Sequence, residues 1–241
     1  MISIVIPVYN SEKIIPKLCK LIHEEMRSQT LVYELILVND CSRDNSESVI
    51  KSLSKKYTEV KGVLLESNVG QQNALLAGLR LARYDIVVTM DDDLQHHPKE
   101  ITHLLAYLDK NTDVVYGVPF HNTVKGYRNI GTHVKELCFL LLLGKPRGVR
   151  LTSFRVMKKE VVKWIISDPL PHIYVSARTL QYTIKIKNIP INYREREQGQ
   201  SNYTFFSLFQ KLFRVVWNYK VLYFWFKSRP CQHQYTIKEI V

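Results

Sequence analysis

Short apolar runs rich in β-branched residues alternate along the chain with longer segments in which apolar residues recur at helical spacing. This alternation predicts an α/β fold, in which a mostly parallel central sheet is flanked by helices. The predicted strands are residues 3–8, 33–38, 60–65, 86–90 and 114–116, and the predicted helices are residues 12–27, 45–57, 71–82 and 99–108.

Polar segments follow four of the predicted strands. They are PVYN at residues 7–10, NDCS at 39–42, ESNVGQ at 66–71 and DDDLQ at 91–95. In open α/β sheets, ligands collect outside the carboxyl ends of the strands. We therefore expect these four segments to converge on one site.

Three consecutive acidic residues, Asp91, Asp92 and Asp93, stand between an apolar strand and a helix predicted to begin near Pro98. In an extended segment, Asp91 and Asp93 would project to one side and Asp92 to the other. Asp91 and Asp93 could then bind a hard divalent cation together with diphosphate oxygens, and the cation would polarise a leaving nucleotide. The alternative is that these acids only solvate the strand end or favour the amino terminus of the next helix. Their position beside three other polar strand ends favours the cation site.

Asp40 and the segment around Gly70 have local interpretations as well as functional ones. Asp40 could accept a hydrogen bond from a base imide or a ribose hydroxyl, or it could form a turn or a helix cap. Asn68 and Gly70 precede an apolar helix, as expected where the backbone approaches a ligand or simply turns into a helix. The chain has neither a GxGxxG nor a GxxxxGK[ST] pattern, which counts against dinucleotide-dependent dehydrogenases and P-loop nucleotide hydrolases.

Length and cysteine usage bound the organisation of the protein. The chain has 241 residues, enough for one sizeable core, and we expect a catalytic domain at 1–202 followed by a tail at 203–241. Its four cysteines form no CxxC pair, so neither a zinc site nor a disulfide framework is expected and a reducing cytosol fits best. No basic region precedes the apolar amino terminus, so a secretory signal is not expected.

The charge balance points to an anionic partner. The formal net charge is +12, and nucleic acid, phosphorylated lipid, a membrane surface and a nucleotide-sugar would all satisfy it. Nucleic acid is not expected, because no reading motif is present and three clustered acids would repel phosphate unless a metal intervened. A nucleotidyltransferase would need a glycine-rich, basic loop near the first strand, which the sequence lacks. A non-catalytic binding protein stays open.

Several segments carry a family resemblance. IPVYN, ILVNDCSRDNS, NVGQQNALLAGL and MDDDLQHHP resemble the successive motifs of family 2 glycosyltransferases with the GT-A fold. The similarity continues through VVYGVPFHNTVKGYRNIG, SFRVMKKEV and REREQGQSNY in the pattern of polyprenyl-phosphate glycosyltransferases, and it covers about residues 1–210. It implies a role in cell envelope biogenesis, with a sugar moved from a UDP-, GDP- or dTDP-linked donor to a polyprenyl phosphate with the help of Mg²⁺ or Mn²⁺. Transfer to a saccharide hydroxyl in polysaccharide assembly is the alternative.

The resemblance also implies residue roles at the positions that match the family's motifs. The expected nucleotide-sugar-binding residues are Pro7, Tyr9, Asn10, Asp40, Asn68, Gly70, Gln71, Asp91 and Asp92. Asp91 and Asp93 would hold the metal, and the expected catalytic residues are Asp93, Gln95, Arg128 and Arg196. Arg128, Arg155, Arg196 and Ser201 would face the acceptor phosphate. The guanidinium fork suits phosphate, but Arg128 and Arg155 could equally be surface residues, and Arg196 could belong to a solvated charge run.

The choice of acceptor decides whether a general base is needed. A lipid phosphate is already anionic at neutral pH, so positioning and stabilisation of the leaving group would dominate, and direct attack would invert the anomeric centre. A sugar hydroxyl would have to lose its proton to a side chain, and His172, Asp168 and Asp92 are the candidates. The sequence does not rank them.

The predicted tail contains an aromatic-rich stretch at residues 204–227 that is interrupted by lysine and arginine. These charges leave it short of the roughly 20 predominantly apolar residues that span a bilayer. Its apolar residues recur at helical spacing, so an amphipathic helix is expected, either in a membrane interface or packed against protein, including a second copy of the chain. We expect the protein in the cytoplasm, peripheral on the inner face of the cell membrane. The similar transferases continue into transmembrane helices that this sequence does not show, which puts the lipid acceptor in doubt.

Overall fold

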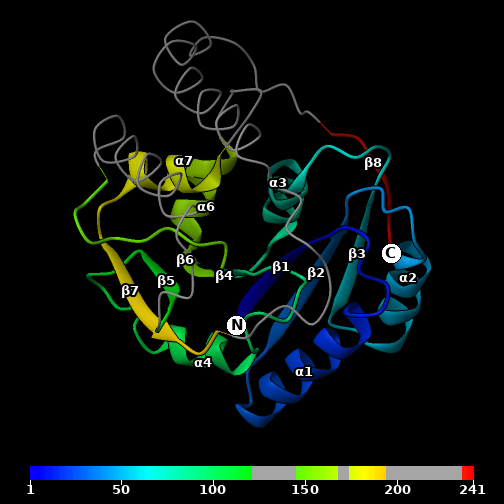
Figure 1. Ribbon diagram of the computed structural model, residues 1–241, viewed down its shortest axis with the longest axis horizontal. Helices are drawn as coiled ribbons and strands as arrows, with labels where there is room; N and C mark the ends of the chain where they lie inside the picture. Colours follow the sequence, from blue (N-terminus) through cyan, green and yellow to red (C-terminus); the bar gives the residue numbers. More distant parts are fainter. Residues whose placement is uncertain (121–144, 168–173, 194–234) are drawn as a thin grey trace, which may run out of the picture.

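The computed structural model describes residues 1–120, 145–167, 174–193 and 235–241 (Figure 1). The elements in chain order are β1 (Ile2–Val8), α1 (Ile15–Ser28), β2 (Tyr33–Asn39), α2 (Ser46–Lys56), β3 (Val60–Leu65), α3 (Gln71–Leu81), β4 (Ile86–Thr89), α4 (Lys99–Leu105), β5 (Val114–Pro119), β6 (Arg155–Lys158), α6 (Lys159–Ile166), α7 (Val175–Tyr182), β7 (Ile186–Ile191) and β8 (Ile237–Ile240).

The strands form one eight-stranded sheet in the order β7-β5-β6-β4-β1-β2-β3-β8. Strand β1 lies at its centre and pairs in parallel with β2 and β4, and β2 pairs in parallel with β3. Strand β6 runs antiparallel to both β4 and β5, whereas β5 and β7 are parallel. The prediction of a mostly parallel sheet with flanking helices is confirmed, and the carboxyl ends of β1 to β4 lie along one edge.

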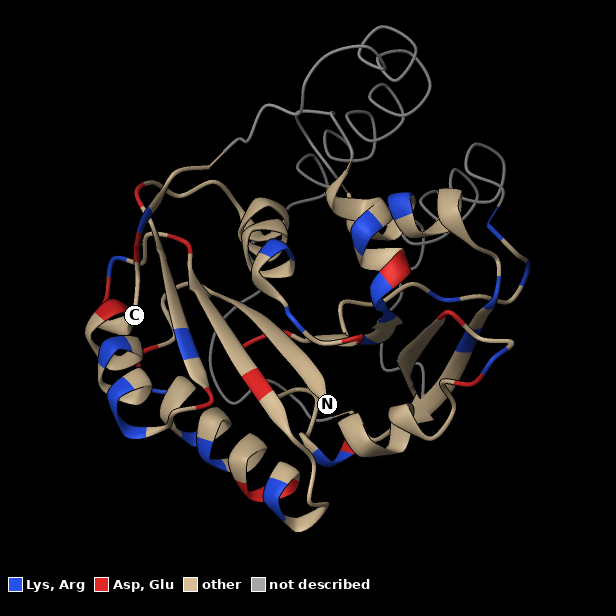
Figure 2. Ribbon diagram, turned by 180° about the vertical axis from the view of Figure 1, so that it is seen from behind, with Lys and Arg blue, Asp and Glu red and all other residues tan. Residues whose placement is uncertain are grey.

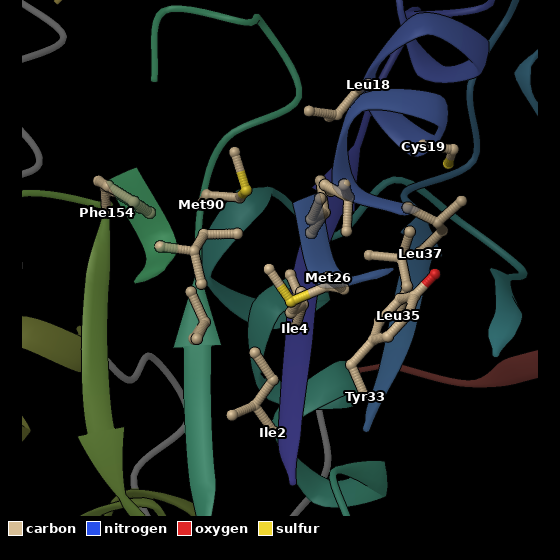
Figure 3. Close-up of a cluster of buried hydrophobic side chains, with 14 of the residues drawn as sticks. Ile2, Ile4, Leu18, Cys19, Met26, Tyr33, Leu35, Leu37, Met90 and Phe154 are labelled. Atoms are coloured by element: carbon tan, nitrogen blue, oxygen red, sulfur yellow. The ribbon is translucent and has the colours of Figure 1, made fainter. Parts of the chain in front are cut away.

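Successive side chains of each strand point to opposite faces of the sheet, and a separate hydrophobic core lies on each face. On one face, Ile4 and neighbouring strand residues pack with Leu18 and Met26 of α1, and α2 and α4 complete this layer (Figure 3). On the other face, Val5 and its neighbours pack with α3, α6 and α7. Helix α3 approaches the sheet closely at Gly78, where an added Cβ would lie 2.4 Å from Val5 Cγ1. Burial on both faces explains why these strands read as continuous apolar runs.

The end of the chain corrects the predicted tail. The tail at 203–241 was expected to be a helical tail, but its described residues, 235–241, contain β8, a strand that pairs antiparallel with β3 and extends the sheet. The Val241 and Gly62 backbones exchange two hydrogen bonds, at 2.7 and 2.9 Å, and Glu239 forms an ion pair with Lys51 at 2.8 Å. The aromatic stretch at 204–227 lies outside the described residues. Among the residues that are described, no helix is long and apolar enough to cross a membrane.

Lysine and arginine positions recur along the helices, α1 and α2 among them (Figure 2). Helix α1 carries Lys17, Lys20 and Arg27, and α2 carries Lys51, Lys55 and Lys56. Part of this charge is paired locally, since Lys20 lies 3.8 Å from Glu24 and Lys51 lies 3.1 Å from Glu47. Exposed pairs of this kind stabilise a fold little, so the surface charge is chiefly a property of solubility and long-range attraction.

Candidate functional site

Asp91 lies in the loop after β4 and connects two neighbouring segments. Gln71 Nε2, at the start of α3, donates a hydrogen bond to Asp91 Oδ1 at 2.7 Å. Ser153 Oγ, two residues before β6, donates to Asp91 Oδ2 at 2.5 Å. Gln71 was predicted to belong to the site, whereas Ser153 was not. These contacts fix the carboxylate at the carboxyl edge of the sheet.

Asp92 turns instead towards the loop after β1. Its Oδ2 accepts hydrogen bonds from Ser11 Oγ at 2.5 Å and from the Tyr9 backbone N–H at 3.2 Å. Desolvation raises the pKa of Asp92 to about 6, and the negative charges of Asp91 and Asp93 add to this rise against the two hydrogen bonds. The expectation that Asp92 points elsewhere than Asp91 agrees with these partners, although β4 ends at Thr89 and the acids lie in a bent loop rather than in a strand.

Residues 91–95, which we call the acidic loop, contain a tight turn between Asp93 and Gln95. The Gln95 backbone N–H donates a hydrogen bond to Asp93 Oδ1 at 3.1 Å, and the intervening Leu94 has a φ of 58°. A positive φ is uncommon for a residue with a branched side chain, so the surrounding structure holds this turn. Leu94 is buried in the core, which supplies that restraint.

The acidic loop fits a divalent metal through its donor chemistry. Asp91 and Asp93 offer carboxylate oxygens, the ligands that Mg²⁺ and Mn²⁺ prefer. Within the described part of the chain, no group of three or more histidine, cysteine or acidic residues is arranged to hold a metal by itself. Asp91 and Asp93 are the residues that could hold such an ion.

Asp40 is buried and holds the segment before α3. Its two carboxylate oxygens accept hydrogen bonds from the backbone N–H groups of Val69 at 2.7 Å and Gly70 at 2.9 Å. Asn68 Nδ2 donates to the Asp40 carbonyl oxygen at 3.0 Å, and Gly70 has the φ of 83° that favours glycine. Burial raises the pKa of Asp40 against these two hydrogen bonds. The local interpretation of Asp40 is thus realised, and because each oxygen keeps a second lone pair, the predicted contact to a base stays a prediction.

The loops after β1 and β2 are also tied together. The Asn10 backbone N–H donates to Ser42 Oγ at 3.0 Å, and Asn10 Oδ1 accepts from the Arg43 backbone N–H at 2.8 Å. Tyr9 and Asn10 are exposed at this edge, whereas Pro7 is buried within β1. With the contacts of Asp40, Asp91 and Asp92, these bonds connect all four polar strand ends. The prediction that they converge is confirmed.

Arg155 is buried rather than on the surface, so its interpretation as a surface residue is wrong. Its side chain is 2% exposed, Nε donates to Thr89 Oγ1 at 3.1 Å and a terminal nitrogen donates to Ser176 Oγ at 3.0 Å. The guanidinium carbon lies 5.7 Å from the centre of the Tyr116 ring. No carboxylate of the described residues pairs with it. A buried cation stabilised only by hydroxyls and an aromatic face is costly, which suits a residue kept for function.

The remaining predicted residues are not placed. Arg128, Arg196 and Ser201 lie outside the described residues, as do the alternative bases Asp168 and His172. Ser11 and Ser153 are the two site residues that sequence reasoning missed. Ser153 begins the SFRVMKKEV segment, but only Arg155 of that segment was given a role, and each serine is recognised by the aspartate it contacts.

Ser153→Ala is expected to lower the affinity for Mn²⁺ about 10-fold, because partners that orient a ligating carboxylate affect metal affinity by that order. Ser153 is the hydroxyl donor to Asp91 Oδ2. Calorimetric titration with Mn²⁺ in the presence of a nucleoside diphosphate measures the change. Ser167→Ala is the control, because that hydroxyl only caps the exposed end of α6 through the Trp164 carbonyl. Equal Mn²⁺ affinities in the two variants would contradict a metal at Asp91.

Comparisons with known proteins agree on one family. Residues 3–166 match the family model described as glycosyl transferase family 2. An undecaprenyl-phosphate 4-deoxy-4-formamido-L-arabinose transferase from Shewanella sediminis is 31% identical over 220 residues, which cover 89% of this chain and 65% of that protein. The protein of the same name from Salmonella choleraesuis is 27% identical over 216 residues, covering 89% and 66% respectively. The chain thus spans slightly less than two thirds of the length of these curated relatives.

Solved structures share the fold at low sequence identity. Glucosyl-3-phosphoglycerate synthase from Mycobacterium tuberculosis, in complex with Mn²⁺, UDP-glucose and phosphoglyceric acid, aligns with a TM-score of 0.64 at 17% identity, over 90% of this chain and 79% of that one. A mannosyltransferase from Pyrobaculum calidifontis, in complex with GDP-mannose and Mn²⁺, aligns with a TM-score of 0.57 at 18% identity, over 78% and 54%. The architecture is that of the GT-A fold.

Proposed function

The chain belongs to glycosyl transferase family 2, and from this premise we propose that it transfers a sugar from a nucleotide-sugar to the phosphate of a polyprenyl carrier. The observation that carries the proposal is the cluster of polar strand ends around Asp91, Asp92 and Asp93. This cluster lies where an open α/β sheet binds ligands. The names of the two curated relatives, which describe undecaprenyl-phosphate sugar transferases, support a polyprenyl phosphate as the acceptor.

We assign the donor to the carboxyl ends of β1, β2, β3 and β4. Tyr9 and Asn10 are exposed after β1, Asn68 and Gln71 are exposed after β3, and Asp40 fixes the segment that carries Asn68 and Gly70. Pro7 is buried, so its role is to shape the end of β1 rather than to offer a polar group. Exposed amide and phenol groups around a rigid frame are suited to bind the base, ribose and sugar.

A divalent ion, Mg²⁺ or Mn²⁺, would be held by Asp91 and Asp93. When bound, it would neutralise the negative charge that develops on the leaving nucleoside diphosphate. The complexes of the structural relatives with Mn²⁺ and nucleotide-sugars support this assignment. Ser153 and Gln71 would orient Asp91, and Asp92 would keep the acidic loop attached to the loop after β1.

With a phosphate as the acceptor, the protein does not have to supply a general base. A phosphate oxygen of the carrier attacks the anomeric carbon, the bond from that carbon to the nucleotide's diphosphate oxygen breaks, and the electron pair leaves with the nucleotide. The attack inverts the anomeric centre and consumes no proton from the acceptor. The main task of the protein is then to hold the carrier phosphate next to the diphosphate of the nucleotide-sugar, and arginines such as Arg155 would offset the repulsion between these two anions.

The acceptor also bears on location. A polyprenyl carrier lies in a membrane, so we propose that the protein works at the inner face of the cell membrane while facing the cytoplasm. The net charge of +12 and the lysines of α1 and α2 would favour an anionic lipid surface. Self-association through the segment after residue 203 stays a prediction.

The acceptor proposal is tested by incubating the purified protein with Mn²⁺, a panel of UDP-, GDP- and dTDP-sugars, and undecaprenyl phosphate in detergent. Release of the nucleotide and a lipid product of the corresponding mass are expected with one donor class. Oligosaccharide acceptors are run in parallel, and product on saccharide alone would replace the lipid proposal by transfer to a hydroxyl. Folded protein that binds nucleotide but transfers to neither acceptor would contradict an enzymatic role for the chain by itself.

A further inference from the structure

His96 lies directly after the acidic loop and is buried between two aromatic rings. Its side chain stacks on Phe154, with ring centres 4.9 Å apart and an angle of 20° between the planes. The ring of Tyr193 meets it nearly edge-on, at 5.3 Å and 69°. Only 5% of His96 is exposed. This geometry is that of an aromatic packing residue, not of a surface histidine or a solvent-facing base.

Hydrogen bonding does not explain why His96 is buried. Nδ1 is buried and has no hydrogen-bond partner among the described residues. Burial lowers the pKa of His96 to about 4, although the nearby charges of Asp93 and Glu100 oppose the change. The ring is therefore neutral at physiological pH, and it acts through its faces and edge.

The two rings that contact His96 belong to segments that reach the site. Phe154 follows Ser153, the donor to Asp91, and precedes the buried Arg155. Phe154 is itself part of the core between the sheet and α1 (Figure 3). A ring pressed against Phe154 therefore restrains the hydroxyl that orients Asp91.

Tyr193 is held to the same place by its backbone. It forms an isolated antiparallel bridge with His96, just beyond the end of β7. The preceding residue, Asn192, donates to Glu100 Oε1 of α4 through its backbone N–H at 3.3 Å and through Nδ2 at 3.4 Å. His96 thus lies where the acidic loop, the segment before β6 and the end of β7 meet.

We propose that His96 is a positioning residue, a neutral aromatic wedge that sets the acidic loop against the segment before β6 and the end of β7. For its effect on turnover, this assignment rests on the proposed glycosyl transfer. It predicts that the flat ring matters and that its nitrogens do not. Phenylalanine should therefore replace histidine at this position, whereas alanine should not.

The test uses His96→Ala and His96→Phe, with His23→Ala as the matched control. His23 also packs between two aromatic rings, Tyr33 at 6.4 Å and Tyr57 at 4.9 Å, but at the opposite edge of the sheet, where β2 begins. Amide hydrogen exchange followed by mass spectrometry reports the loops directly, without any need for a substrate. In His96→Ala, peptides covering residues 89–97 and 150–157 should exchange faster than in the wild type, whereas His23→Ala and His96→Phe should leave them unchanged.

Turnover supplies the second readout. His96→Ala is expected to lower kcat for sugar transfer about 10- to 100-fold, since small displacements of reacting groups cost that much. His96→Phe should restore kcat to within about threefold of the wild type by the same argument.

If His96→Ala and His23→Ala lose thermal stability equally while both loops exchange as in the wild type, His96 is only a core residue and the proposal fails. If His96→Phe is as impaired as His96→Ala in both readouts, the wedge is also overturned, because a ring nitrogen is then required. A wild type that transfers no sugar contradicts the proposed function alone, since the exchange experiment still decides the role of His96.

Discussion

Asp93→Asn is expected to reduce kcat/KM for sugar transfer about 100- to 1000-fold, the range for losing a group that stabilises charge in the transition state. Asparagine keeps the size of the side chain and can still accept the Gln95 backbone N–H through Oδ1, so the turn at Leu94 should survive. What is removed is one negative charge from the pair that would hold the metal. Nucleotide release, measured across a titration of Mn²⁺, should show a weaker metal dependence as well as a lower maximum rate.

Asp109→Asn is the matched control for this substitution. Asp109 is a surface carboxylate that pairs with Lys187 at 2.8 Å, away from the strand ends, and its side chain is 52% exposed. Its replacement should leave both the rate and the Mn²⁺ titration unchanged. Should Asp93→Asn keep its rate within threefold of the wild type and the same Mn²⁺ midpoint, Asp93 would not be a metal ligand, and the acidic loop would be a structural feature of the strand end.

The first half of the fold was predictable because its pattern is local. Strands β1 to β4 are buried on both faces, so each appears as a short apolar run between helical segments, and β3 was predicted with its observed bounds of Val60–Leu65. Polar residues stop each run at the edge where ligands bind. Parallel βα units repeat this signal, which is why convergence of the four strand ends could be predicted before any contact was known.

The second half was missed because its signals are nonlocal or mixed. Strand β6 passes into α6 between Lys158 and Lys159, with no turn residue to separate the two periods. Strand β7 contains Pro190, which argues against a strand except at an edge, and β7 is in fact an edge strand. The four residues of β8 are recognised as a strand only by their pairing with β3. Insertion of the antiparallel β6 between β4 and β5 likewise depends on contacts distant in sequence.

The same distinction holds within the site. The three aspartates were identified because a run of like charge at a strand end needs a reason. Ser11 and Ser153 were given no role, even though Ser153 begins the SFRVMKKEV segment, because their contacts are with Asp92 and Asp91, which lie 81 and 62 residues away in the chain.

Arg155→Met is expected to separate stability from activity. Arg155 is 2% exposed, and its side chain donates hydrogen bonds to two hydroxyl groups and lies over an aromatic ring, with no carboxylate partner among the described residues, so the fold bears the cost of desolvating its charge. Methionine fills a similar length without that cost, and replacing buried charges by apolar groups is often neutral or stabilising. Thermal unfolding should therefore show an unchanged or higher Tm. If the guanidinium serves the acceptor phosphate, KM for undecaprenyl phosphate should rise at least about 30-fold, the factor that corresponds to roughly 2 kcal/mol for a lost charged contact.

Arg83→Met shows what a structural arginine would do instead. Arg83 Nε donates to Glu34 Oε2 at 2.9 Å, and the Glu34 side chain is only 3% exposed, so removing the guanidinium leaves a buried carboxylate with less compensation. That variant should unfold at a lower temperature and transfer sugar at the wild-type rate. An exposed arginine that stabilises a buried carboxylate and a buried arginine that the protein keeps for function thus give opposite pairs of results. If Arg155→Met behaves like Arg83→Met, with a lower Tm and an unchanged KM, Arg155 holds the sheet to α7 through Ser176 and has no part in binding the acceptor.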